Sequence, residues 1–217
     1  MRNLEPRILN VATVFVVDDD ASVRKALERS IRTAGLNVKI FTSAREFLEQ
    51  GAPEGVGCLV LDIRMPGLSG LELQAELNSR NIRLPIIFIT GHGDIPMSVQ
   101  AMKGGAVDFL PKPFKSSDLL RGIQQALEQD DYRQRSRAES TEVHRRLQTL
   151  TPREREVLNL VVKGRLNKQI AAELGAAIRT VKVHRGRVMQ KMAVQSVADL
   201  VRAVERVKAE GESQPAA

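Results

Sequence analysis

Short apolar runs alternate with segments of helical periodicity over about the first 130 residues of the chain. Five runs rich in Val, Ile, Leu and Phe are typical of strands buried on both faces, and they cover residues 11–17, 38–41, 58–61, 86–89 and 107–110. Between and after these runs, apolar residues recur every three or four positions, as on one face of a helix. Five strand–helix units in succession predict a parallel sheet with helices on both faces.

Capping residues mark the expected starts of two of these helices. Ser43 and Glu46, and likewise Ser69 and Glu72, have the spacing of a capping box, in which each side chain bonds the backbone N–H of the other residue. A further helix is predicted over 95–103, closed by two glycines.

Polar side chains follow four of the five predicted strands. They are Asp18, Asp19, Asp20, Asp62, Thr90 and Lys112. Ligands of parallel sheets bind beyond the carboxyl ends of the strands, so we expect these groups to converge at one edge. Asp20 has the position of a helix cap, because apolar periodicity begins at Val23. The other carboxylates repel one another, and a hard divalent cation such as Mg²⁺ relieves that repulsion.

The second part of the chain has a different pattern. Thr151 to Glu154 has the form of a capping box with Pro at the first helical position, and Asn167 is expected to cap a second helix. A third helix would bury Val181, Val188 and Met192, and a fourth spans residues 197–204. The charged stretch before them, residues 131–147, contains no Pro or Gly and predicts a helical linker, with a disordered tether as the alternative.

Charge separates the two parts. Residues 1–126 hold 15 basic and 14 acidic side chains, whereas the stretch from Arg145 to Lys191 holds 12 basic and 3 acidic ones. A small residue at Ala171, a glycine at 175 and an apolar residue at Val181 have the spacing of a helix-turn-helix. The basic excess independently indicates a polyanionic partner, so we expect this part to bind DNA.

Composition excludes several other classes. A single cysteine, Cys58, rules out a disulfide framework and a cysteine-based zinc site, and the three histidines have no metal-ligand spacing. No apolar run approaches the ~20 residues of a membrane span, and no signal peptide is evident. We therefore expect a cytoplasmic protein.

Four motifs make the first part specific. The segments VFVVDDD, LVLDIRMPGLSG, FITGHGD and DFLPKPF resemble, in this order, the receiver domain of bacterial response regulators over about residues 10–130. The resemblance implies a flavodoxin-like, doubly wound (βα)5 fold with strand order 2-1-3-4-5.

The resemblance also implies roles for individual residues. Asp62 would accept a phosphoryl group from a histidine kinase. Asp19, with Asp18 in support, would hold Mg²⁺ together with Asp62 and the backbone carbonyl of Arg64. Three more residues complete the implied site: Lys112 paired with Asp62 and preceding a cis proline, Thr90 bonded to a phosphoryl oxygen, and the switch aromatic Phe109. For Phe109 a plain core role stays open.

The second part resembles the LuxR-type four-helix DNA-binding domain. The segments LTPREREVLNLVVKGRLNKQIAAELG and TVKVHRGRVMQKM carry this similarity over about residues 148–207. Together the two parts resemble the NarL/FixJ class of transcription factors. The expected layout is a receiver over 10–130, a linker over 131–147, an all-α helix-turn-helix domain over 148–210 and a disordered tail over 211–217.

Helical geometry assigns expected DNA contacts on the third helix. At ~100° per residue, Lys182 and Val183 point away from the buried face, with Arg187 on its flank. Lys182 and Val183 match positions that LuxR-type proteins use for bases, whereas Gly186 departs from relatives that carry a long side chain. Expected phosphate contacts are Lys168, Arg179, Thr180, Arg185 and Lys191. For Arg185, only about 40° from Val181, a packing role is equally open.

These expectations describe a two-component response regulator that is not a turnover enzyme. Phosphorylation of Asp62 would favour a homodimer that binds two-fold promoter DNA, with a sensor kinase and RNA polymerase as further partners. Two alternatives stay open. One is a constitutive DNA-binding protein whose receiver only dimerises; the other is a phosphatase using Asp18 as nucleophile, which the context of Ala21 disfavours.

Overall fold

The computed structural model describes residues 12–51, 54–91 and 95–212, and it divides into two compact units, Met1–Gln134 and Arg135–Ala217. The boundary between the units falls within one helix, α6 (Ser116–Gln148).

The first unit is built on five parallel strands. They are β1 (Thr13–Val17), β2 (Asn37–Phe41), β3 (Gly57–Asp62), β4 (Ile86–Thr90) and β5 (Asp108–Pro111). Their order in the sheet is β2-β1-β3-β4-β5, all neighbours being parallel, so the predicted topology is confirmed. Strands β1, β3 and β4 are buried on both faces, as their unbroken apolar runs predict.

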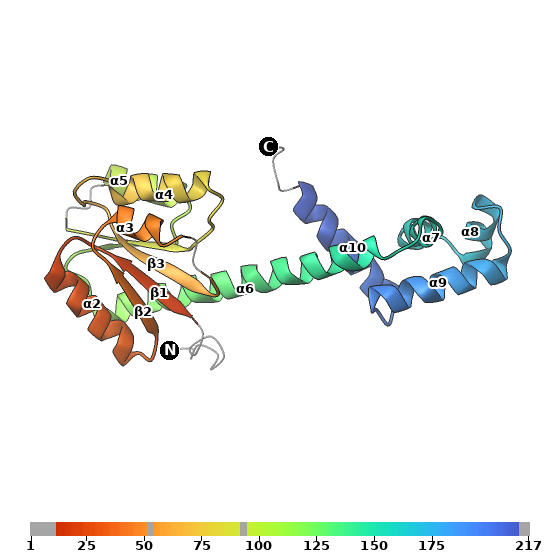
Figure 1. Ribbon diagram of the computed structural model, residues 1–217, viewed down its shortest axis with the longest axis horizontal. Coiled ribbons are helices and arrows are strands. Elements are labelled where there is room, and N and C mark those ends of the chain that lie inside the picture. Colours follow the sequence, from red (N-terminus) through yellow and green to blue (C-terminus); the bar gives the residue numbers. More distant parts are fainter. Residues whose placement is uncertain (1–11, 52–53, 92–94, 213–217) are drawn as a thin grey trace. The chain divides into compact units, whose positions relative to one another are not determined.

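Helices cover both faces of this sheet (Figure 1). Helix α2 (Ala21–Thr33) and the first half of α6 bury Leu27, Ile31, Leu119 and Ile123 against one face. The helices of the other face are α3 (Ala44–Glu49), α4 (Gly70–Ser79) and α5 (Ile95–Lys103). The two apolar layers enclose the central strands and hold the carboxyl ends of β1, β3 and β4 at one edge.

The two capping boxes predicted in the first unit have different outcomes. At α4, Ser69 and Glu72 each bond the other's backbone N–H, so this box is confirmed. At α3, the Ser43 hydroxyl accepts from Glu46 N, but the Glu46 carboxylate bonds the N–H and hydroxyl of Thr42 instead of Ser43. Thr42 offers two donors where Ser43 N offers one, and the Glu46 pKa is lowered by these bonds to Thr42.

Helix α6 is fastened to the amino-terminal edge of the sheet in the first unit. The buried carboxylate of Asp130 accepts from Gly57 N at 3.0 Å and from Gln134 Nε2 at 2.8 Å. Gln134 Nε2 also donates to the Gly55 carbonyl, and Arg133 Nη1 donates to the carbonyl of Arg83. These contacts extend the first unit to Gln134, four residues beyond the predicted receiver boundary.

The second unit has an all-helical core. Its helices after α6 are α7 (Pro152–Val162), α8 (Asn167–Glu173), α9 (Ile178–Met192) and α10 (Val197–Glu212). Val143 and Leu147, near the end of α6, pack against this core, so part of the predicted linker belongs to the unit. Helix α10 includes residues 211 and 212, which we expected in the disordered tail, and 213–217 lie outside the described residues.

The start of α8 corrects one prediction. The cap position is Leu166, whose N–H donates to the Gln169 side chain, and Asn167 is the first helical residue. Asn167 does not cap the helix, because its side-chain oxygen accepts a hydrogen bond from Arg185 Nη1 at 2.9 Å. The capping box of Thr151 and Glu154 at the start of α7 is confirmed.

Candidate functional site

Asp18, Asp19 and Asp62 form a carboxylate cluster at the carboxyl edge of the sheet. Asp62 is the last residue of β3, and the two other acids directly follow β1, the neighbouring strand. Each of the three can offer one carboxylate oxygen such that all lie within 4.8 Å of one another. Asp18 and Asp62 are buried, whereas Asp19 is exposed. The convergence predicted from the strand ends is therefore present.

Lys112 places an ammonium group inside this cluster. Its Nζ lies 2.7 Å from Asp18 Oδ2 and 3.6 Å from Asp62 Oδ1. The backbone positions it, because Lys112 N donates to the Thr90 carbonyl at 2.7 Å and the Lys112–Pro113 peptide bond is cis, as expected. The Lys112 ammonium thus pairs with two of the three carboxylates of the cluster.

Burial of the cluster changes the acidity of Asp62. Desolvation raises the pKa of its carboxyl to about 6; Lys112 and the Ile63 N–H oppose this effect, and Asp18 and Asp19 add to it. One ammonium does not balance three carboxylates in this setting. The oxygen-rich donor set suits a hard divalent ion such as Mg²⁺, so the residues present fit that metal.

The loop that carries Asp18 and Asp19 is fixed by its own side chains. Asp18 Oδ1 accepts from Asp20 N at 2.8 Å, and Asp20 Oδ1 caps α2 by accepting from Ser22 N and Val23 N. These bonds lower the pKa of Asp20, which keeps it charged at the positive end of the helix. The capping role predicted for Asp20 is confirmed.

Two residues of this site were missed in the sequence. Arg24 Nη1 donates to the Asp18 carbonyl at 2.7 Å, one helical turn into α2. Gly70, the first residue of α4, packs so closely on β3 that a Cβ atom there would lie 2.3 Å from the Asp62 carbonyl oxygen. The LSG motif contained that glycine, but sequence spacing gives no sign of which backbone it approaches.

The other expected residues lie around the cluster. Thr90 ends β4 and is 1% exposed, and Phe109 on β5 is half-buried against the core of the α3–α5 face. Arg64 follows β3 by two residues and its side chain is exposed. The roles implied for these three residues stay predictions.

The second unit presents a basic helix beside a tight turn. Gly175, with φ of +61°, separates α8 from α9, and Val181, Val188 and Met192 are buried as predicted. Most of the expected DNA contacts are exposed, namely Lys168, Arg179, Thr180, Lys182, Val183 and Arg187. Val183 is an apolar side chain that is 48% exposed on α9.

Arg185 and Lys191 differ from that exposed group. Arg185 is half-buried and bonds Asn167 across the helix pair. Lys191 Nζ bonds Glu154 Oε2 at 2.7 Å and the Thr149 carbonyl at 2.9 Å. Both cations are engaged within the unit, which agrees with the packing role left open for Arg185 and gives Lys191 an internal partner.

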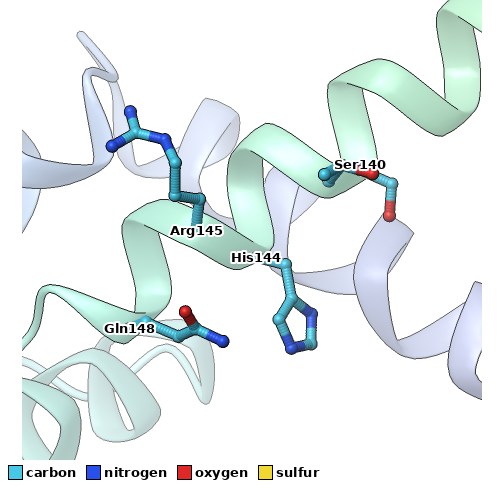
Figure 2. A pocket seen from close by; sticks show the side chains of 5 residues that line it. Ser140, His144, Arg145 and Gln148 are labelled. Atoms are coloured by element: carbon cyan, nitrogen blue, oxygen red, sulfur yellow. The ribbon is translucent and has the colours of Figure 1, made fainter.

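A hollow of about 320 Å³ lies along α6 in the second unit, lined by Ser140, Thr141, His144, Arg145 and Gln148 (Figure 2). It contains no carboxylate and is not part of the acidic cluster, which belongs to the first unit. Within the described ranges, no helix combines the length and apolar character needed to cross a membrane.

Comparison with known families covers both units. Residues 14–124 match the response regulator receiver domain, and residues 148–204 match the bacterial regulatory proteins of the luxR family. The chain therefore belongs to the two-component response regulators of the NarL/FixJ class, in which a receiver domain is joined to a LuxR-type DNA-binding domain.

Individual relatives agree over almost the full length. Nodulation protein W of Bradyrhizobium diazoefficiens is 54% identical over 191 residues, covering 88% of this chain and 84% of the relative. The transcriptional regulatory protein FixJ of Azorhizobium caulinodans is 46% identical, over 87% of this chain and 90% of its own. Among solved structures, the response regulator StyR is 52% identical with a TM-score of 0.82, covering 90% of this chain and 99% of that chain.

Proposed function

We propose that this response regulator is switched by phosphoryl transfer to Asp62, and that the switch controls a homodimer that binds promoter DNA in the cytoplasm. The observation that carries the proposal is the Lys112 ammonium held between Asp18 and Asp62 at the edge of the sheet. Phosphoryl transfer needs positioned charge more than a protein acid or base, and this cluster supplies it.

The oxygens of Asp62 have different surroundings. Oδ1 accepts from Ile63 N at 3.0 Å and lies nearer to Lys112, so Oδ2 is the oxygen that attacks phosphorus. The bond from phosphorus to the kinase histidine breaks as the Oδ2–P bond forms, and the lone pair of the leaving nitrogen returns to the imidazole. Asp19, Asp62 and the Arg64 carbonyl, with support from Asp18, would hold Mg²⁺, which would supply positive charge for the phosphoryl oxygens.

Lys112 and Thr90 complete the proposed chemistry. Lys112 moves from Asp18 and Asp62 to pair with the new phosphoryl oxygens. Thr90, the last residue of β4, donates its hydroxyl to one of these oxygens. Phe109 on the neighbouring strand then packs further into the space that Thr90 leaves. The group at Asp62 is a stored signal and not a turnover product, so the chain is not an enzyme.

Helix α5 provides the surface for the homodimer. Its Ile95, Val99 and Met102 are 80%, 45% and 47% exposed, which is unusual for large apolar side chains so close together. A second copy of this chain covers this apolar surface of α5. We expect Val99→Glu to keep phosphorylation and to lose the dimer seen by sedimentation with acetyl phosphate, whereas Tyr132→Glu, an exposed change on α6, retains it.

The test of phosphoryl transfer is labelling by acetyl phosphate with Mg²⁺. Wild type and the control Asp118→Asn should take up one phosphoryl group, and Asp62→Asn should take up none. Labelling of Asp62→Asn at the wild-type level would overturn the proposal. Continuous release of phosphate from an ester substrate would instead support the phosphatase alternative.

DNA binding across a random duplex library, with and without acetyl phosphate, tests the proposed control of DNA binding by phosphorylation. We expect phosphorylation to raise affinity for a two-fold site, read by Lys182 and Val183 with Arg187 beside them and with phosphate contacts from Lys168, Arg179 and Thr180. DNA binding that does not depend on the phosphodonor would favour a constitutive regulator.

In the proposed function, the chain bound to its promoter would be placed where it can contact RNA polymerase.

A further inference from the structure

The last turn of α9 is held by polar groups outside the helix-turn-helix pattern. Arg146 Nη1, on α6, donates to the carbonyl oxygen of Met192, the last residue of α9, at 2.9 Å. Lys191 Nζ donates to the Thr149 carbonyl at 2.9 Å and to Glu154 Oε2 at 2.7 Å. Three directional bonds thus tie the carboxyl end of α9 to α6, to the loop after α6 and to α7.

These bonds restrict movements of α9 that the apolar core permits. The core holds α9 through Val181, Val188 and Met192, which lie along one face. Apolar contact is not directional, so it opposes separation of the helices more strongly than a small slide or rotation. The Met192 carbonyl has no partner within its helix, and a guanidinium there satisfies it and interacts favourably with the negative end of the helix.

Small movements at this end are large at the DNA-facing end. Lys182 and Val183 lie about 14 Å along the helix from Met192, so a tilt of about 5° displaces them by about 1 Å. A displacement of that size breaks a hydrogen bond to a base edge, whereas a flexible cation follows a phosphate over the same distance.

From this geometry we propose that Arg146 is a positioning residue for DNA sequence recognition. It sets how α9 presents Lys182 and Val183 to the bases, and it acts through the Met192 carbonyl without touching DNA. The inference rests on the proposed function, since it concerns how the same helix discriminates between sequences.

Arg145 is a matched control for Arg146. Both guanidinium groups bond the Glu142 carboxylate at 2.8 Å, and both residues belong to the same turn of α6. Only Arg146 reaches α9 through a described hydrogen bond; Arg145 leaves the helix on a different side from His144 (Figure 2). Replacing either arginine removes the same charge and a partner of the same carboxylate.

The experiment compares Arg146→Met with Arg145→Met in the full chain, treated with acetyl phosphate and Mg²⁺. Methionine keeps most of the stem packing and removes the guanidinium. The probes are the duplex that the wild-type chain enriches from a library of about 20 randomised base pairs and a shuffled duplex of the same composition. The measured quantity is the ratio of the two affinities, with its dependence on salt.

Arg146→Met should lower this ratio by about tenfold, the effect of losing one charged hydrogen bond. Arg145→Met should leave the ratio within about twofold, and the salt slopes of the two variants should agree within about half of the change that one phosphate contact makes. Amide exchange at Ala193 and Val194, directly after α9, should increase only in Arg146→Met.

Other outcomes overturn the inference. Equal ratios for the two variants mean that Arg146 has no positioning role, and a lower salt slope for Arg146→Met means that it contacts phosphate directly. If Arg146→Met does not fold, the pair Arg146→Gln and Arg145→Gln, whose side chains are shorter and uncharged, is compared instead, and equal ratios again overturn the inference. If the wild-type chain enriches no duplex at all, the proposed function fails and this inference with it.

Discussion

Lys191 Nζ lies 2.7 Å from Oε2 of Glu154, a carboxylate that is only 2% exposed. The pair joins α9 to the start of α7, and the same carboxylate caps α7 by accepting from Thr151 N. Glu154 therefore caps α7 and also holds α9 in place. The phosphate contact expected for Lys191 stays a prediction, and the structure shows that its ammonium also has an internal partner.

Lys191→Met is expected to lower the free energy of unfolding by about 1–3 kcal/mol, because it leaves a buried carboxylate without its cation. Lys182→Met, the same change at an exposed position of α9, is expected to leave stability unchanged and to weaken DNA binding. Urea unfolding and DNA titration of both variants check this reciprocal pattern. Equal stability of the two variants would contradict it.

The Lys191–Glu154 pair should also make stability depend on pH. The bond from Lys191, followed by that from Thr151, lowers the pKa of Glu154 from 4.5 to about 2. A folded pKa below the unfolded value means that the stabilisation is fully present above about pH 4.5 and is lost as the pH falls toward 2. Carboxyl NMR titration should find Glu154 ionised at pH 3.5 in wild type and largely protonated in Lys191→Met, if that variant remains folded there.

Asp62→Asn is expected to stabilise the metal-free chain at pH 8. The folded pKa of Asp62, about 6, lies above its ordinary value of 3.8, so ionisation of Asp62 opposes folding increasingly as the pH rises from 3.8 through 6. After allowance for solvent screening the gain is about 1 kcal/mol, and it should shrink toward pH 5. Urea unfolding in EDTA at both pH values measures it, and a pH-independent loss of stability would show that the carboxylate cluster is not strained by its charge.

Asp130→Ala is expected to destabilise the receiver by about 1–3 kcal/mol, since the N–H of Gly57 would lose its buried acceptor. Glu128→Ala removes an exposed acid from the same helix and serves as the control. Thermal unfolding of the full chain should show an earlier receiver transition only for Asp130→Ala. Coincident transitions for both variants would mean that Asp130 does not hold α6 to the sheet.

Gly70→Ala should impair phosphorylation although residue 70 bears no reactive group. Its Cβ would meet the Asp62 carbonyl at 2.3 Å, so either α4 or the end of β3 must move. We expect at least about a tenfold fall in the rate of acetyl phosphate labelling, because a misplacement near 1 Å can cost up to about a hundredfold in rate. Gly91→Ala, for which no atom lies within 4 Å of the added Cβ, should label at nearly the wild-type rate.

Sequence patterns predicted the strands and the carboxylate cluster because those features follow from local periodicity and from a general rule about sheet edges, whereas the strand order came from the resemblance to receiver domains. Asp62 and Lys112 could be placed together without knowing any distance, since both follow strands that end at the same edge. The buried valines of α9 were likewise readable from helical spacing.

Contacts between distant side chains and backbone could not be predicted in the same way. Asn167 is of a residue type that often caps helices, yet its side-chain oxygen accepts a hydrogen bond from Arg185. The Glu46 carboxylate accepts from Thr42, where the spacing predicted Ser43. Arg146 and Lys191 looked like members of a uniform basic surface. Each of them also bonds a backbone carbonyl oxygen, of Met192 and of Thr149, and every residue carries such an oxygen, so no sequence pattern distinguishes these partners.

The division of contacts along α6 has a consequence for hybrid regulators. Asp130 bonds the first residue of β3 and Gln134 bonds the loop before it, whereas Val143 and Leu147 pack in the DNA-binding core. A junction for exchanging receivers between relatives therefore belongs between residues 135 and 139, in phase with the helix. A junction at the predicted boundary of 130 would give the recipient a receiver without Gln134 and a foreign helix face against its strands.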